Sequence, residues 1–242
     1  MSMLAAFWRS TIGKKVVMAV TGVFMIAWIA GHVSGNLLMF RGEEAMNHYA
    51  AFLKSLGGLL WLVRGLLLTA VILHIVSAYQ LTMIARRARV HDYEKRVPQV
   101  STWASRTMRW GGVLLLVFIV FHLAHFTFGW IDSATFSDTD VYSNVVIGLR
   151  QPLFAAFYVV AMGALGLHIF HGAWASVRTL GLAKPSSHPL HRRLATVLAI
   201  GVWLGFTVIP VAVMLGIVTV DSSHTVPTAA TAPAPSSPTH NQ

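Results

Sequence analysis

Long runs of hydrophobic residues dominate the chain, and short polar segments separate them. There are five such runs, at about 16–40, 59–85, 110–130, 152–177 and 194–220. At about 1.5 Å rise per residue, a helix over each run can cross the roughly 30 Å hydrocarbon core of a bilayer. Helix is the only viable state for an open chain in lipid. The pattern therefore predicts an all-α integral membrane protein, with five transmembrane helices in one domain over residues 1–220.

Two flanking segments need separate interpretations. Basic residues precede the first run, as in a signal peptide, but the run is too long and lacks an Ala-x-Ala cleavage site, which favours a retained span. Residues 221–242 are rich in Thr, Ala, Pro and Ser and show no hydrophobic period. This composition predicts a disordered tail.

The basic residues lie unevenly about the five runs. Fourteen Lys and Arg fall on one side of the predicted membrane domain and four on the other. The richer side holds Arg9, Lys14, Lys15, Arg86, Arg87, Arg89, Lys95, Arg96, Arg106, Arg109, Arg178, Lys184, Arg192 and Arg193, and the poorer side Arg41, Lys54, Arg64 and Arg150. The positive-inside rule then predicts a cytoplasmic N-terminus and an external C-terminus. Orientation and anionic lipid alone explain this basic face, and docking of a soluble partner is the open alternative.

Composition removes several classes of function. The chain is 55% hydrophobic and 11% charged, with a mean hydropathy of +0.65, which excludes an ordinary soluble domain. It has no cysteine, so it cannot itself hold an iron–sulfur cluster or a thiolate-bound haem. No GxGxxG sequence or phosphate loop indicates a nucleotide or flavin fold. Redox chemistry beyond a haem would therefore belong to other subunits.

Four of the five runs contain a histidine that is set among apolar residues: His32, His74, His122 and His168. An ionisable ring inside a membrane is costly and indicates a functional site with a partner. Two imidazoles on facing helices suit the axial positions of a haem iron. His32 and His122 lie about ten residues from the outer ends of their runs, and the other two lie a similar depth from the inner ends. The predicted pairs are therefore His32 with His122 and His74 with His168.

The residues around these histidines leave alternatives open. Small residues lie one turn away, including Ala70, Ala78, Ala164, Gly172 and, near His32, Gly31 and Gly35. They suit either haem clearance or helix–helix packing. His125 and His171 each follow a candidate ligand by three residues, so spacing alone permits either member, and His-x-x-His also raises a zinc site. The remaining histidines are predicted to be solvated: His48, His91, His188, His191, His224 and His240.

Several motifs are similar to those of a known family. The first run contains His32-Val33-Ser34-Gly35-Asn36, the next loop Arg41-Gly42-Glu43-Glu44-Ala45-Met46-Asn47, and the fourth run His168-Ile169-Phe170-His171-Gly172-Ala173-Trp174. Over residues 8–218 the chain resembles the five-helix, di-haem cytochrome b anchor of succinate dehydrogenases and fumarate reductases. The resemblance implies two b haems with His32, His74, His122 and His168 as axial ligands, which selects His122 over His125 and His168 over His171.

The resemblance also implies a role and a location. Such an anchor is not catalytic toward the dicarboxylate. It passes electrons between a membrane quinone, here expected to be menaquinone, and cytoplasmic flavoprotein and iron–sulfur subunits, in a bacterial cell membrane. Some similar proteins carry a carboxylate two residues before the fourth ligand, where this chain has Gly166, and no Asp or Glu lies within any run. Glu43 and Glu44 are the nearest outer acids, either at a quinone or proton entry or simply solvated.

Two rival functions remain at this point. The first keeps the haems and changes the partner to a formate dehydrogenase or a hydrogenase. The second is a haem-free transporter or proton channel lined with histidines, which would place polar residues repeatedly on the histidine faces.

Overall fold

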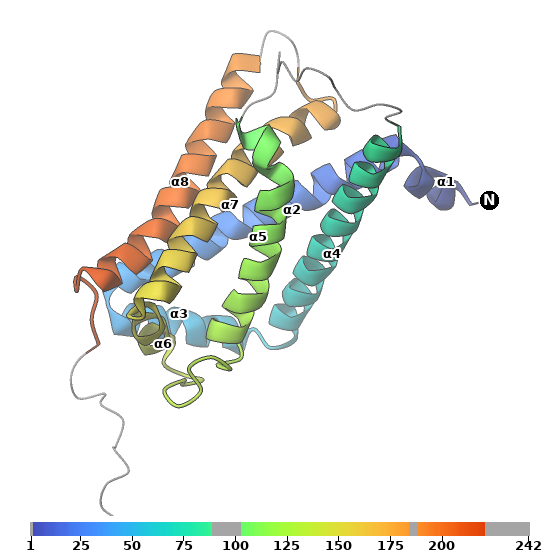
Figure 1. The fold of residues 1–242 in the computed structure, drawn as a ribbon. Helices are drawn as coiled ribbons and strands as arrows, with labels where there is room; N and C mark the ends of the chain where they lie inside the picture. Colours follow the sequence, from blue (N-terminus) through green and yellow to red (C-terminus); the bar gives the residue numbers. More distant parts are fainter. Residues whose placement is uncertain (1, 89–102, 184–187, 221–242) are drawn as a thin grey trace, which may run out of the picture.

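The computed structural model describes residues 2–88, 103–183 and 188–220, and within them the secondary structure is helical (Figure 1). Five helices are long and apolar enough to cross a membrane, which confirms the predicted fold class. These helices are α2 (Thr11–Asn36), α4 (Gly58–Arg87), α5 (Trp103–Phe126), α7 (Pro152–Thr179) and α8 (His188–Met214). The predicted tail at 221–242 lies outside the described residues, as do His91, Arg89, Lys95, Arg96, Lys184, His224 and His240.

Two helices are shifted relative to the hydrophobic runs. Helix α5 begins at Trp103 and ends at Phe126, although the run suggested 110–130. It stops there because the chain turns through Gly129, whose φ of 62° favours glycine, and the ring of Phe136 packs on that glycine. Helix α8 likewise ends at Met214, before Gly216 with φ 69°, so the apolar residues that follow lie in a turn.

Four short elements were not predicted. Helix α1 (Met3–Arg9) precedes α2. The Lys14 ammonium of α2 donates to the backbone carbonyls of Trp8 and Arg9 at the C-terminus of α1, at 2.7 and 3.0 Å. The 3-10 helix η1 (Leu37–Arg41) and helix α3 (Glu43–Ser55) follow α2, and α6 (Val141–Leu149) precedes α7. Helix α6 is almost wholly buried, so this segment is part of the core.

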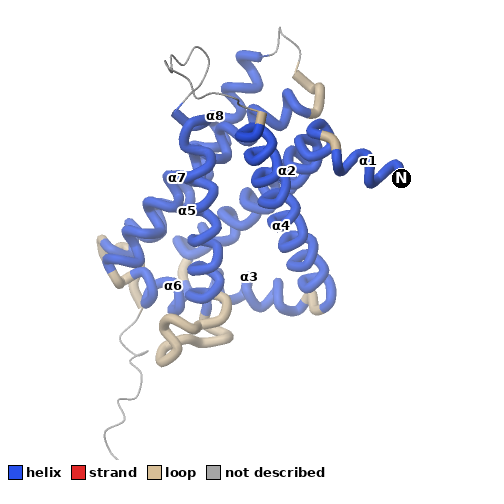
Figure 2. The backbone as a smooth tube through the Cα atoms, turned by 45° about the vertical axis from the view of Figure 1, so that its right-hand side comes forward, coloured by secondary structure: helices blue, strands red, loops and turns tan. Residues whose placement is uncertain are grey.

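The long helices pack in a definite order. Helix α4 packs on α2, with the two diverging toward α3, while α5 packs on α7, α7 packs on α8, and α2 crosses α7 (Figures 1 and 2). Helices α3 and α6 lie together at one end of the bundle, which we call the α3–α6 end. The Asn47 side chain joins them, since it donates to Asp140 at 2.9 Å and accepts from the backbone N–H of Tyr142 at 3.0 Å.

Charge divides between the two ends of the bundle. The described carboxylates all belong to the α3–α6 end: Glu43, Glu44, Asp132, Asp138 and Asp140. We call the opposite end, where α4 and α7 finish and α8 begins, the basic end, because it holds Arg86, Arg87, Arg106, Arg109, Arg178, Arg192 and Arg193. A multi-pass membrane protein with one strongly basic end follows from this arrangement.

Candidate functional site

The four histidines within the hydrophobic runs come together as two pairs. The ring centroids of His32 on α2 and His122 on α5 are 5.9 Å apart. Those of His74 on α4 and His168 on α7 are 6.1 Å apart. The structure thus brings together the same two pairs that depth in the membrane had suggested.

The two pairs lie at different levels of the bundle. Gly22 of α2 faces the His74 ring, with its ideal Cβ position 3.3 Å from His74 Cε1. His32 follows ten residues later on the same helix, about 15 Å farther along its axis. The His32–His122 pair is therefore near the α3–α6 end, and the His74–His168 pair is nearer the basic end.

Each pair connects helices that do not pack closely on each other. The extensive backbone contacts join α2 with α4, α5 with α7, and α2 with α7, whereas the histidines join α2 with α5 and α4 with α7. Neither helix pair that a histidine pair joins has such extensive contact within the described residues. The side chains thus meet across gaps between backbones, as they would around an inserted group.

Hydrogen bonding sets the tautomer of His74. Its Nδ1 lies 3.0 Å from the carbonyl oxygen of Met18, and because a carbonyl only accepts, this nitrogen carries the proton. The Thr21 hydroxyl lies 3.2 Å from the same nitrogen and directs its own proton to the Val17 carbonyl at 2.7 Å. The lone pair of neutral His74 is therefore on Nε2. A histidine held in this way through Nδ1 is typical of a metal ligand.

A longer chain of polar side chains begins at His122. The Tyr158 hydroxyl lies 3.3 Å from His122 Nδ1 and 3.3 Å from His125 Nδ1. His125 Nε2 in turn lies 2.8 Å from a carboxylate oxygen of Asp132. His125 is 1% exposed, and it fits against α6 because a Cβ on Gly148 would stand 2.5 Å from His125 Nε2. These hydrogen bonds connect His122 with the Asp132 carboxylate at the α3–α6 end.

The other two histidines have less hydrogen bonding. Trp28 stacks on His32 at a centroid distance of 4.7 Å, and the Asn36 amide donates to the His32 backbone carbonyl at 2.8 Å while lying 3.3 Å from its Nδ1. His168 Nδ1 is buried with no hydrogen-bond partner among the described residues.

The small residues near the histidines have different roles. Gly35 accommodates the Tyr49 ring of α3, since a Cβ there would lie 2.5 Å from it. Gly166 lets α7 approach Trp203 of α8, at 3.2 Å from its Cβ position. Gly172 is one turn from His168 and has no atom within 4 Å of its Cβ position. Gly172 therefore leaves open space next to the histidine, whereas the other two serve packing.

Three residues of the site were not identified from the sequence. Asp132, Tyr158 and Gly148 were not proposed as site residues from the hydrophobic runs or the motifs. Asp132 lies outside every hydrophobic run, yet the turn after α5 brings its carboxylate back to His125. Glu43 and Glu44, the acids considered instead, lie in the first turn of α3, where negative charge suits the helix dipole.

The donor set limits which metal centre is possible. No group of three or more His, Asp or Glu that could hold a metal ion occurs in the described parts of the chain, which leaves the zinc alternative without a ligand set there. Each histidine pair offers two nitrogens. At metal–nitrogen distances of about 2.0 Å, two imidazoles on opposite sides of one metal place their centroids roughly 6 Å apart. The pairs therefore suit a metal whose remaining ligands come from a macrocycle, and a haem is such a group.

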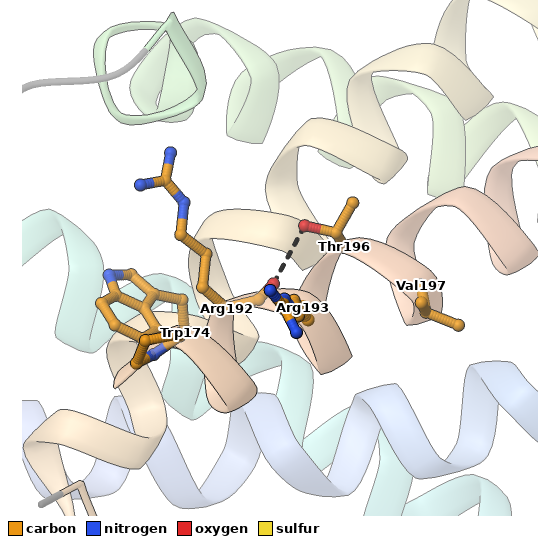
Figure 3. Close-up of a pocket in the computed structure, with 6 residues that line it drawn as sticks. Trp174, Arg192, Arg193, Thr196 and Val197 are labelled. Atoms are coloured by element: carbon orange, nitrogen blue, oxygen red, sulfur yellow. Dashed lines mark hydrogen bonds between the residues drawn. The ribbon is translucent and has the colours of Figure 1, made fainter. Parts of the chain in front are cut away.

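A pocket of 730 Å³ lies at the basic end between α7 and α8 (Figure 3). It is lined by Trp174, Pro189, Arg192, Arg193, Thr196 and Val197. Both arginines are exposed, and the Thr196 hydroxyl donates to the Arg192 carbonyl at 2.9 Å. Two arginine side chains line this surface, and guanidinium groups favour binding of a carboxylate or phosphate.

Comparison with known proteins identifies no relative. No family model matches the chain, and neither a curated protein nor a solved structure matches it significantly. The functional assignment therefore depends on the geometry of the two histidine pairs and on the sequence motifs.

Proposed function

We propose that the chain is a di-haem cytochrome b, with His32 and His122 holding one haem and His74 and His168 the other. The observation that carries this proposal is the pair of centroid distances, 5.9 and 6.1 Å, across helices without extensive direct packing. Two bis-histidine b haems, when bound, supply single-electron transfer between the two levels of the bundle. The polar partners of His74 and His122 orient the ligand rings.

The resemblance of the motifs extends the proposal to a complex. We infer that the chain is the membrane anchor of a succinate:quinone oxidoreductase, which exchanges electrons between a quinone, by that resemblance menaquinone, and soluble flavoprotein and iron–sulfur subunits. In this assignment the basic end faces the cytoplasm, as the positive-inside rule predicts. The dicarboxylate chemistry belongs to the flavoprotein, and this chain supplies the haem path and the docking surface.

Substrate-dependent haem reduction tests the complex. In membranes that contain the chain, we expect succinate to reduce its haems and fumarate to reoxidise them, and a tagged chain to co-purify with a flavoprotein and an iron–sulfur protein. Reduction by formate or by hydrogen instead would indicate that the chain is the cytochrome b subunit of a formate dehydrogenase or of a hydrogenase. A folded chain without haem would favour the transporter.

Docking of the soluble subunits is proposed to use the arginine pocket of the basic end. Replacing both Arg192 and Arg193 with glutamate should reduce co-purification of the iron–sulfur subunit at least about tenfold, since like charges at an interface cost several kcal/mol. Quantitative mass spectrometry of the purified complex measures this. A matched control replaces Arg41 and Arg150, exposed at the opposite end, with glutamate. Equal loss in both double variants would contradict a docking role for the pocket.

His125 and His171 are expected not to be ligands. We predict that His125→Ala and His171→Ala each retain two haems in a pyridine haemochrome assay. His125→Ala should also unfold at lower temperature, because it leaves a cavity and removes the partner of Asp132, at a cost of about 2–5 kcal/mol. Loss of one haem in His171→Ala, or a loss in His125→Ala that Tyr158→Phe does not reproduce, would show that the ligand within that His-x-x-His is wrongly chosen.

A further inference from the structure

The polar chain from His122 to Asp132 has a definite direction. The Asp132 carboxylate accepts a hydrogen bond, so His125 Nε2, at 2.8 Å, carries a proton. Neutral His125 then has its lone pair on Nδ1, which accepts from the Tyr158 hydroxyl at 3.3 Å. The Tyr158 oxygen in turn accepts from His122 Nδ1, also at 3.3 Å. Each donor and acceptor is used once, and the His122 lone pair is left on Nε2.

We infer that Asp132 is a positioning residue: through His125 and Tyr158 it fixes the tautomer of His122 that can bind iron. This inference rests on the proposed haem site. Without the Tyr158 hydroxyl, His122 has no acceptor for its Nδ1 proton among the described residues. His74 uses the Met18 carbonyl for that purpose. The tautomer and orientation of a ligating histidine depend on such outer partners.

The packing around the chain is built to hold it. Tyr158 is 7% exposed and its ring stands edge-on to Phe118, at a centroid distance of 5.0 Å. Phe126 stacks on His125 at 4.0 Å with an interplanar angle of 17°. The Asp132 carbonyl accepts from the backbone N–H groups of Thr135 and Phe136, both at 3.0 Å, which closes the turn that carries the carboxylate. Each member therefore has a fixed position.

The negative charge also has an electronic consequence. A carboxylate at the end of the chain draws the hydrogen-bonded protons outward and makes the His122 nitrogen a stronger donor to iron. Stronger donation favours the oxidised iron. The haem at the α3–α6 end should therefore have a lower midpoint potential than it would with a neutral residue at position 132, and the other haem should not respond.

Equilibrium redox titration of the purified complex tests this inference. In Asp132→Asn, which keeps the shape and removes the charge, we expect two haems and a higher midpoint potential for the haem at the α3–α6 end alone. Asp132→Glu should restore the wild-type potential. Tyr158→Phe, which interrupts the chain, should weaken binding of the same haem by about 10- to 100-fold.

The possible results distinguish the positioning role of Asp132 from the di-haem assignment on which it rests. Two haems with unchanged potentials in Asp132→Asn, or an equal shift of both haems, would overturn the positioning role and leave the di-haem assignment intact. A wild-type chain without haem would overturn both. If Asp132→Asn does not fold, Asp132→Glu and Tyr158→Phe test the positioning role instead. Normal haem affinity in Tyr158→Phe would contradict the proposed hydrogen-bond path from Asp132 to His122.

Discussion

Replacing His74 or His168 with alanine is expected to remove the haem near the basic end and to leave the other haem bound. The two histidines face each other at 6.1 Å, and either variant leaves one axial position of the same iron empty. The second pair is about 15 Å farther along α2, at a level that the substitution does not touch. The reduced spectrum of each purified variant should therefore show about half of the wild-type haem.

The matched control is His171→Ala, one turn from His168 on the same helix, which should keep both haems. The double variant His74→Ala with His168→Ala should lose no more haem than either single variant, because both substitutions remove one site. Retention of two haems in either single variant, or further loss in the double variant, would contradict the pairing of these residues.

Filling the space next to His168 should have the second largest effect. Gly172 shares a helix face with His168, and no atom lies within 4 Å of its Cβ position. If a haem occupies that space, Gly172→Leu places a side chain against it. Overpacking costs about 1–3 kcal/mol, which converts to roughly 5- to 150-fold weaker haem binding. Titration of the apo-protein with haem, or the haem content after purification, measures the loss.

Gly65→Leu is the control for that prediction. Gly65 also has open space at its Cβ position, and it lies nine residues before His74 on α4, on the opposite face of the helix. We expect this variant to keep two haems, since its new side chain meets lipid. Equal haem content in the Gly172→Leu and Gly65→Leu variants would show that Gly172 does not border a haem.

The sequence allowed the long helices and the histidine pairs to be predicted for a clear physical reason. A lipid-facing helix must be apolar along its whole length, so hydrophobic runs mark its position, and a histidine within such a run stands out. Equal depth then predicts which histidines meet, as the His32–His122 and His74–His168 distances confirm. Their role as haem ligands stays a prediction.

The short elements and the polar chain could not be predicted in the same way. The end of α5 depends on Gly129 and on its contact with Phe136, which lies seven residues farther on. The burial of α6 arises from tertiary packing, because a nine-residue helix is too short to form without it. Asp132 reaches His125 because the turn after α5 folds back on that helix, and Tyr158 reaches His125 because α7 packs on α5. No local spacing in the sequence predicts either contact.

The measurement that tests the central claim most directly is a pyridine haemochrome assay, with a reduced-minus-oxidised spectrum, on the purified chain. The two histidine pairs predict two b haems per chain. One haem per chain would contradict the assignment of a separate haem to each pair. A folded protein without any haem would contradict the redox function itself, and the histidines would then have to be explained as part of a transport path.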